Sequence, residues 1–185
     1  MGKAHELEGF SNEFAIPVKI KIHKTYNSIQ DSVLIIDHGK KNVSSTYGHN
    51  LMDNHPIRED RINEAEENFI LLMGLLETGD FNGFAEIVEK EALSIHDLME
   101  KSTPSYSLLK NESYEVITRI KEFRKNKKMP VCFTLDAGPN VHIIYPLEFK
   151  KEIVNFIEGE LSGFCIIGNW IDDWIGRGPE KLILS

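Results

Sequence analysis

One stretch, residues 133–146 with the sequence FTLDAGPNVHIIYP, constrains the fold of this chain more than any other segment. Two apolar, β-rich runs, VCFTLD and VHIIYP, flank the four residues AGPN, a spacing that is typical of a β-hairpin. Gly138 can adopt a positive φ and Pro139 has a fixed φ, so this turn is stiff. The pattern predicts two antiparallel strands whose corner holds Asp136 in one place.

The runs around this hairpin predict an α+β domain. Apolar residues at helical spacing predict helices near residues 62–76, 84–99, 116–123 and 149–157. Gly79 ends the first helix and Asp80 caps the second, which is expected to bury the stripe Phe84, Ile87, Val88, Ala92, Ile95 and Met99. Further strands are expected at SVLIIDHG from Ser32, at FCIIG and at KLILS. The order β-α-α-α-β-β-α-β favours an antiparallel sheet with helices packed mainly on one face.

Composition excludes several classes of protein. A length of 185 residues suits one domain, and a net charge of −8 argues against nucleic acid as the main partner. The basic cluster at 121–128 closes a predicted helix, where cations complement the helix dipole. No window holds 18 uninterrupted apolar residues and the N-terminus has no apolar signal core, so no membrane span and a cytoplasmic location are expected. Cys132 and Cys165, inside apolar runs, are expected to be buried free thiols.

Asp136 has two interpretations from the local sequence. As an ordinary turn residue, its carboxylate accepts hydrogen bonds from turn amides. As a general base, it lies within about 3 Å of the proton that it takes, which requires a rigid support. Ser45 and Thr46 raise the same choice, because hydroxyls at a helix start either cap the helix or hold a phosphate oxygen.

Other polar residues favour structural roles. His96 is interpreted as a core or loop-anchoring histidine rather than a catalyst, and the seven histidines show no metal-ligand spacing, so no metal site is predicted. Trp170 and Trp174 are either core anchors or part of a self-association face, with the core favoured. Asp172 and Asp173 are expected in a solvated turn, and the glycines of WIGRGP in another.

The segment FTLDAGPN closely resembles the TFDAGPN signature of the diphosphomevalonate decarboxylases, a family within the GHMP small-molecule kinase superfamily. Three more segments resemble this family in the expected order, EGFSNEFAIPV, VSSTYGHNLM and EALSIHDLMEKSTPSY, so the resemblance covers residues 8 to 146. It is a resemblance to the C-terminal part alone, since nothing here matches the phosphate-cradling loop of the family's N-terminal half. It implies an inter-domain segment at 1–17 and a ferredoxin-like C-terminal domain at 18–185, with the ATP-binding domain absent.

The resemblance also implies a function. The complete enzyme of this family binds ATP, Mg²⁺ and mevalonate 5-diphosphate, phosphorylates the 3-hydroxyl, and releases isopentenyl diphosphate, carbon dioxide, phosphate and ADP. By match, Asp136 is the base or orienting group at the 3-hydroxyl, Ser45 and Thr46 contact the substrate diphosphate, and Ala137 allows close approach. Thr46 stands where many bacterial members have Arg, and His49 replaces a common Met, which bears on substrate preference.

These implications lead to three alternatives. The first is the C-terminal domain of such a decarboxylase, inactive and without bound cofactor as this chain alone, with the N-terminal half of the protein as its partner. The second is a related kinase or decarboxylase that acts on another mevalonate phosphate. The third is a non-enzymatic, stand-alone domain that self-associates or binds a partner through its sheet. An antiparallel sheet with an exposed edge is compatible with a homodimer.

Overall fold

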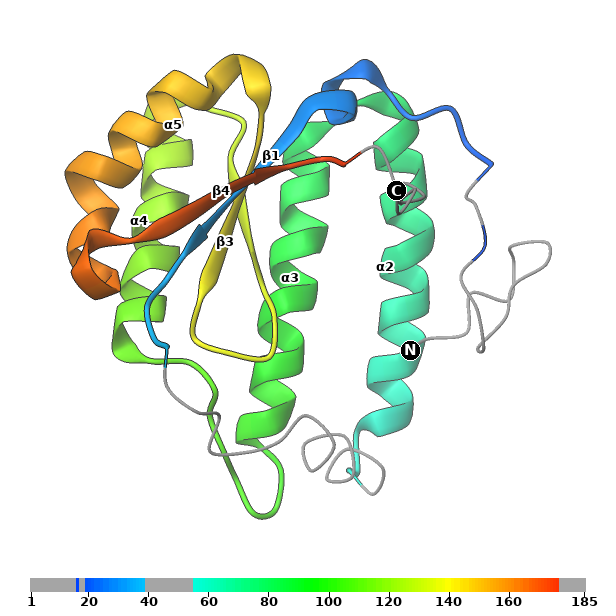
Figure 1. The fold of residues 1–185 in the computed structure, drawn as a ribbon. Helices are drawn as coiled ribbons and strands as arrows, with labels where there is room; N and C mark the ends of the chain where they lie inside the picture. The colour runs from blue at the N-terminus through cyan, green and yellow to red at the C-terminus, as the bar shows by residue number, and fades with distance from the viewer. Residues whose placement is uncertain (1–15, 17–18, 39–54, 177–185) are drawn as a thin grey trace, which may run out of the picture.

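The computed structural model of the chain describes residues 16, 19–38 and 55–176. Within them, four strands form one antiparallel sheet in the order β2-β3-β1-β4 (Figure 1). Their bounds are β1 Ile29–Leu34, β2 Cys132–Leu135, β3 Val141–Pro146 and β4 Trp170–Trp174. β2 and β3 are consecutive and form the predicted hairpin, whereas β1 pairs with β3 and β4 across long connections.

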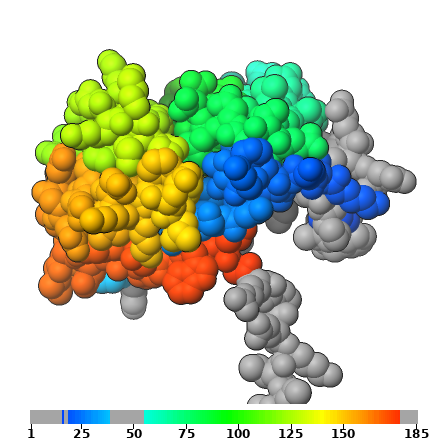
Figure 2. Space-filling view, turned by 90° about the horizontal axis from the view of Figure 1, so that it is seen from above, coloured from blue at the N-terminus to red at the C-terminus, as the bar shows by residue number. Residues whose placement is uncertain are grey.

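The described residues also form four α-helices: α2 Arg58–Thr78, α3 Phe81–Glu100, α4 Asn111–Lys127 and α5 Lys150–Phe156. A π-helical turn at Ile157–Leu161 continues α5, and 3₁₀ turns occupy Lys24–Ser28, Leu147–Phe149, Ser162–Phe164 and Ile166–Gly168. Helices α2, α3 and α4 lie side by side in one layer, as the space-filling view also shows (Figure 2). The element order and the α+β class are therefore those predicted from the sequence.

The main core lies between one face of the sheet and the helices α4 and α5. Burial alternates along β1 and β3, as expected for strands with one covered face. The fully buried Leu34, Ile143 and Tyr145 point to this face and pack in one cluster with Ile120 and Ile153 of the helices. Helix α3 packs against the edge strand β2 instead. The prediction of helices mainly on one face is confirmed, and the opposite face of the sheet is left more open.

The turn between α2 and α3 has the capping residues that the sequence predicted. Gly79 has φ 79° at the C-terminus of α2, and a Cβ there would lie 2.2 Å from the ring of His23, so only glycine fits. Asp80 caps α3 by accepting bonds from the backbone N–H groups of Asn82 and Gly83, both at 3.1 Å.

Three strand predictions need correction. β1 begins at Ile29, three residues before the predicted start at Ser32, and ends at Leu34. FCIIG forms 3₁₀ turns, with Ile167 at φ 54° and 90% exposed, rather than a strand. The last strand of the described sheet is WIDDW, so the turn expected at Asp172 and Asp173 is wrong, although both residues are exposed to solvent as expected. KLILS lies outside the described residues, as do most of residues 1–17 and the segment after Ser45.

The register of β4 on β1 explains why WIDDW forms a strand rather than a turn. Antiparallel pairing places Asp172 opposite Ser32. The hydroxyl of Ser32 donates to the carboxylate of Asp172 at 2.8 Å, so this acidic residue is stabilised within the sheet.

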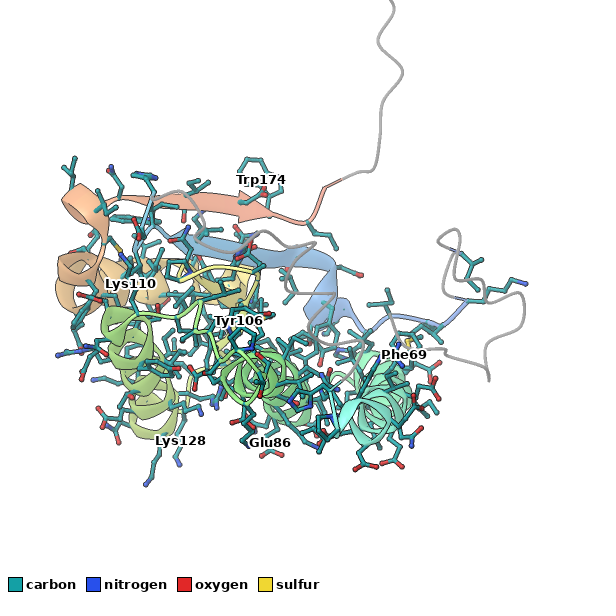
Figure 3. All side chains as sticks on the ribbon, turned by 90° about the horizontal axis from the view of Figure 1, so that it is seen from below. Phe69, Glu86, Tyr106, Lys110, Lys128 and Trp174 are labelled. Carbon is teal, nitrogen blue, oxygen red and sulfur yellow. The ribbon has the colours of Figure 1, made fainter. Side chains whose placement is uncertain are left out.

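Trp170 packs against the core, as predicted. Trp174 instead stands out from the strand and is 62% exposed, so the core interpretation is wrong for it (Figure 3). Cys132 and Cys165 are buried free thiols, as predicted.

The buried face of α3 is not the apolar stripe that the sequence predicts. Of the predicted residues, Ala92 is buried, and the others are partly exposed. The residues that are buried are Phe81, Ala85, Glu89, Ala92, His96 and Leu98. Two of them are polar, and both find partners inside the domain, which apolar periodicity cannot anticipate.

The first of these polar residues, Glu89, joins three elements. Its carboxylate accepts from both Nη1 and Nη2 of Arg124 on α4, the latter at 2.9 Å, and from the backbone N–H of Phe133 on β2 at 3.3 Å. Arg124 also donates to the carbonyl of Val131 at 2.9 Å, and its bond to Glu89 raises its pKa. Glu89 is 5% exposed, so this bidentate pair fixes α3, α4 and β2 in a largely dry environment.

The Glu89→Leu variant is expected to lose about 3 kcal/mol of the free energy of unfolding, because Arg124 and the N–H of Phe133 lose their partner. Urea unfolding followed by circular dichroism measures this loss. The double variant Glu89→Leu/Arg124→Met is expected to recover most of it, since no uncompensated charge is left. The control Glu86→Leu, at an exposed position of the same helix, stays within about 0.5 kcal/mol. Equal losses in Glu89→Leu and the control would contradict this.

Candidate functional site

The candidate site is the corner between β2 and β3. The last residue pair of the hairpin is Leu135 with Val141, so the loop contains the five residues DAGPN. The sequence predicted four, with Asp136 ending the strand. Asp136 therefore belongs to the loop, and its position depends on what holds the loop rather than on the strand ladder.

The first end of this loop is held from α3. Nε2 of His96 lies 3.1 Å from the backbone carbonyl oxygen of Asp136. Because a carbonyl can only accept, Nε2 carries the proton and donates it. The backbone N–H of Gly138 donates to the same oxygen at 2.8 Å, so two donors fix the first peptide group of the loop.

The second end is held from α4 and from the segment after β1. Ser113, in the first turn of α4, donates its hydroxyl to the carbonyl of Pro139 at 2.6 Å. The side-chain oxygen of Asn140 accepts from the backbone N–H groups of Ile36 at 2.9 Å and Asp37 at 3.1 Å. The loop is thus bonded to three elements, and its stiffness does not come from Pro139 alone.

The side chain of Asp136 is exposed, whereas Ala137 is half-buried and Gly138 is buried. Among the described residues, no N–H donates to the carboxylate of Asp136; the turn bond from Gly138 goes to its backbone oxygen. The turn-residue interpretation required bonds from loop amides to this carboxylate, and the described part of the chain contains none. The catalytic role of this carboxylate stays a prediction.

His96 has the loop-anchoring role that the sequence suggested, and the loop that it anchors is the candidate site. It is 3% exposed, and burial lowers its pKa despite the opposing effects of the bond to Asp136 and the charge of Glu100. The ring is therefore neutral near neutral pH. Its Nδ1 is buried and has no hydrogen-bond partner in the described ranges.

A second histidine lies on the open face of the sheet. His142 of β3 is opposite Thr134 of β2, close to the loop, and its Nδ1 is 2.9 Å from Oδ2 of Asp31 on β1. The hydrogen bond to Asp31 raises the pKa of His142 against the effect of its partial burial, and the charge of Asp136 adds to this. This pair was not predicted from the sequence, because the predicted strand begins at Ser32 and leaves Asp31 outside it.

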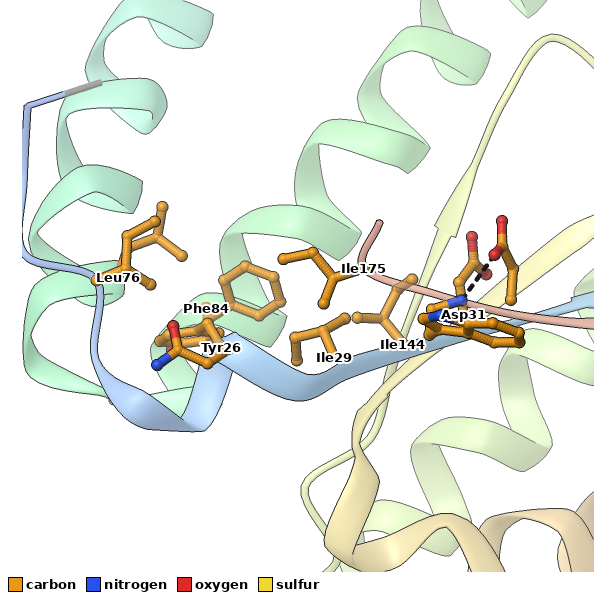
Figure 4. Close-up of a pocket in the computed structure, with 11 residues that line it drawn as sticks. Tyr26, Ile29, Asp31, Leu76, Phe84, Ile144 and Ile175 are labelled. Carbon is orange, nitrogen blue, oxygen red and sulfur yellow. Dashed lines mark hydrogen bonds between the residues drawn. The ribbon is translucent and has the colours of Figure 1, made fainter. Parts of the chain in front are cut away.

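A hollow of about 430 Å³ lies elsewhere on the open face (Figure 4). Ile29 and Ile144 of the sheet line it together with Tyr26, Leu76 and Phe84, and Asp31 lies at one side. Asp136 is not among its lining residues, so this hollow and the anchored loop are distinct features.

The other predicted site residues have different outcomes. Ser45 and Thr46 lie outside the described residues, so their contact with a phosphate stays a prediction, as does the role of Ala137. No group of three potential metal ligands occurs within residues 19–38 and 55–176. No helix in these ranges is long and apolar enough to cross a bilayer. Lys110 pairs with the carboxylate of Asp37, the residue whose backbone N–H donates to Asn140.

An antiparallel sheet with helices on one face and an anchored DAGPN corner defines an α+β domain of the GHMP kinase C-terminal type. The chain belongs to the mevalonate 5-diphosphate decarboxylase C-terminal domain family, whose model matches residues 32–166.

Similar proteins share this assignment. Diphosphomevalonate decarboxylases of Ganoderma lucidum and Debaryomyces hansenii are each 27% identical to the chain, over 159 and 176 residues. These matches cover 82% and 85% of the chain but 39% and 45% of the two relatives. The solved mevalonate diphosphate decarboxylase of Staphylococcus aureus superposes with a TM-score of 0.75 at 26% identity, covering 87% of this chain and 48% of that one. The chain therefore spans less than half the length of these relatives.

The Asp31→Asn variant is expected to destabilise the domain more at about pH 5.5 than at about pH 9. Because the pKa of His142 is raised in the folded state, its stabilising contribution is fully present below the unfolded value of 6.5 and is lost as the pH rises through the folded value. Urea unfolding at both pH values measures the difference. The control Asp97→Asn, at an exposed position of α3, has no histidine partner and should show no such pattern. Equal losses at both pH values would show that the pair is not charged.

Proposed function

We propose that the chain is the substrate-facing C-terminal domain of an ATP-dependent decarboxylase that converts mevalonate 5-diphosphate to isopentenyl diphosphate in the cytoplasm. Family membership supports the reaction class. The single observation that carries the role of the site is the exposed carboxylate of Asp136 on a loop bonded to three elements. Asp136 accepts the hydrogen of the substrate's 3-hydroxyl, as base or orienting group, and Ala137 allows close approach. Ser45 and Thr46 bind the diphosphate.

The anchored loop suits this task physically. Phosphoryl transfer depends mainly on positioning and on neutralising charge, so a carboxylate that orients the hydroxyl is useful even as a weak base. The bonds that His96 and Ser113 donate to the loop, and the bond that Asn140 of the loop accepts from Ile36, restrict the loop before substrate arrives. This lowers the entropy that binding would otherwise cost.

ATP and Mg²⁺ belong to the complete enzyme in this proposal. Two solved neighbours are MDDEF in complex with MVAPP, one of them also with AMPPCP and magnesium. No group of three potential metal ligands occurs in residues 19–38 and 55–176, and the sequence has no segment like the family's phosphate-cradling loop. We therefore assign both groups to a partner N-terminal half, corresponding to the part of the relatives that the chain does not span. The step that ATP supplies is transfer of a phosphoryl group to the substrate.

The chain alone is expected to release no ADP from ATP, Mg²⁺ and mevalonate diphosphate, whereas the product of the complete gene does so. In that product, Asp136→Asn is expected to lower kcat about 10²- to 10⁴-fold, which is the usual contribution of a general base. A coupled ADP assay measures both. The control Asp97→Asn removes an exposed carboxylate from α3 and should leave kcat unchanged.

Two results would overturn parts of this proposal. Turnover by the chain alone would show that no N-terminal half is required. Full activity of Asp136→Asn would remove the catalytic role of the loop. A panel of mevalonate phosphates in the same assay distinguishes the diphosphate from another mevalonate phosphate as the substrate.

We also propose that the domain forms a homodimer through the β4 edge. β4 is an outer strand of the sheet, and Ile171, Trp174 and Ile175 are 56%, 62% and 55% exposed on it or directly after it. Light scattering is expected to give twice the monomer mass, and Trp174→Lys is expected to return the monomer because a charge replaces the apolar contact. Lys127→Gln, at an exposed site on α4, is the control. A monomeric wild-type chain would contradict the dimer.

A further inference from the structure

His96 is buried with only one of its two ring nitrogens hydrogen-bonded within the described residues. It is 3% exposed, and its Nδ1 has no hydrogen-bond partner among residues 19–38 and 55–176. A buried acceptor without a partner costs free energy, whereas an apolar side chain of similar shape would avoid this cost. The stability of α3 alone therefore gives no reason for a histidine at this position.

Nε2, the other ring nitrogen of His96, gives a reason for a histidine at this position. Nε2–H donates to the backbone oxygen of Asp136, which also accepts from the N–H of Gly138. Two donors that converge on one oxygen restrain the peptide group that follows the α-carbon of Asp136. This limits the movement of the backbone from which the exposed residue Asp136 projects.

The protonation state of His96 favours this bond near neutral pH. Burial lowers the pKa of His96, so the ring stays neutral and keeps one N–H for the carbonyl. The charged groups around it are Glu100 on the same helix and Asp136 on the loop. His142, the other histidine near the loop, differs in this respect because Asp31 favours its charged form.

We propose that His96 is the positioning residue of Asp136: it orients the loop's first peptide group from α3 so that the carboxylate points at the reacting hydroxyl. This inference rests on the proposed decarboxylase function for its catalytic consequence. His96 acts through Asp136 and does not itself touch the substrate.

The first test uses this chain and needs no turnover. In His96→Leu, amide hydrogen exchange at Gly138, measured by NMR, is expected to become about tenfold faster, the equivalent of one lost hydrogen bond. The urea midpoint of the same variant should stay unchanged, because the unpaired Nδ1 is removed together with the bond. His96→Gln keeps an N–H donor at a similar reach and should restore most of the protection. Leu98→Ala is the matched control: it creates a cavity on the same helix and should lower the urea midpoint without a selective change at Gly138.

The second test uses the product of the complete gene. His96→Leu is expected to lower kcat about 10- to 100-fold with KM nearly unchanged, and His96→Gln should recover most of the loss. A residue that merely stabilises the domain would lower the urea midpoint and the active fraction together, as Leu98→Ala does. Unchanged exchange at Gly138 in His96→Leu would overturn the inference, and so would an unchanged kcat. If exchange responds but the wild-type gene product does not act on mevalonate diphosphate, the proposed function is wrong while the anchoring of the loop stands.

Discussion

The arrangement of this domain depends on one buried ion pair, between Glu89 of α3 and Arg124 of α4. Its carboxylate also accepts from a backbone N–H of β2, and its guanidinium donates to a carbonyl just before that strand. A charge in this place is costly unless every donor and acceptor is satisfied, so the pair permits one relative position of the two helices and the strand. The strand that it holds is the one that leads into Asp136.

The loop after that strand is also held by α3 and α4. Helix α3 reaches it through His96 and α4 through Ser113, while the segment after β1 reaches it through Asn140. The frame that Glu89 and Arg124 fix near the start of β2 is therefore continued to its far end. A loop that is bonded on three sides can present an exposed carboxylate with little motion, which is what a catalytic or orienting group requires.

The sequence predicted the elements better than it predicted the face that each one buries. Period-3.6 spacing located α2, α3 and α4, and the caps at Gly79 and Asp80 placed the turn between the first two. On α3, however, the buried face holds Glu89 and His96, which no apolar pattern can indicate. β4 was misread for a similar reason. WIDDW looks like a turn until Ser32 of a strand about 140 residues away supplies a donor for Asp172.

The sequence by itself determined the β-hairpin, its glycine and proline corner, and the family to which the chain belongs, because these depend on residues adjacent in the chain. It also placed Asp136 at that corner. The tertiary structure alone decided that the carboxylate is exposed, that His96 is neutral and bonded to the loop, and that His142 is paired with Asp31. These properties depend on burial and on partners far away in the sequence, and they exist only when the helices and strands have packed together.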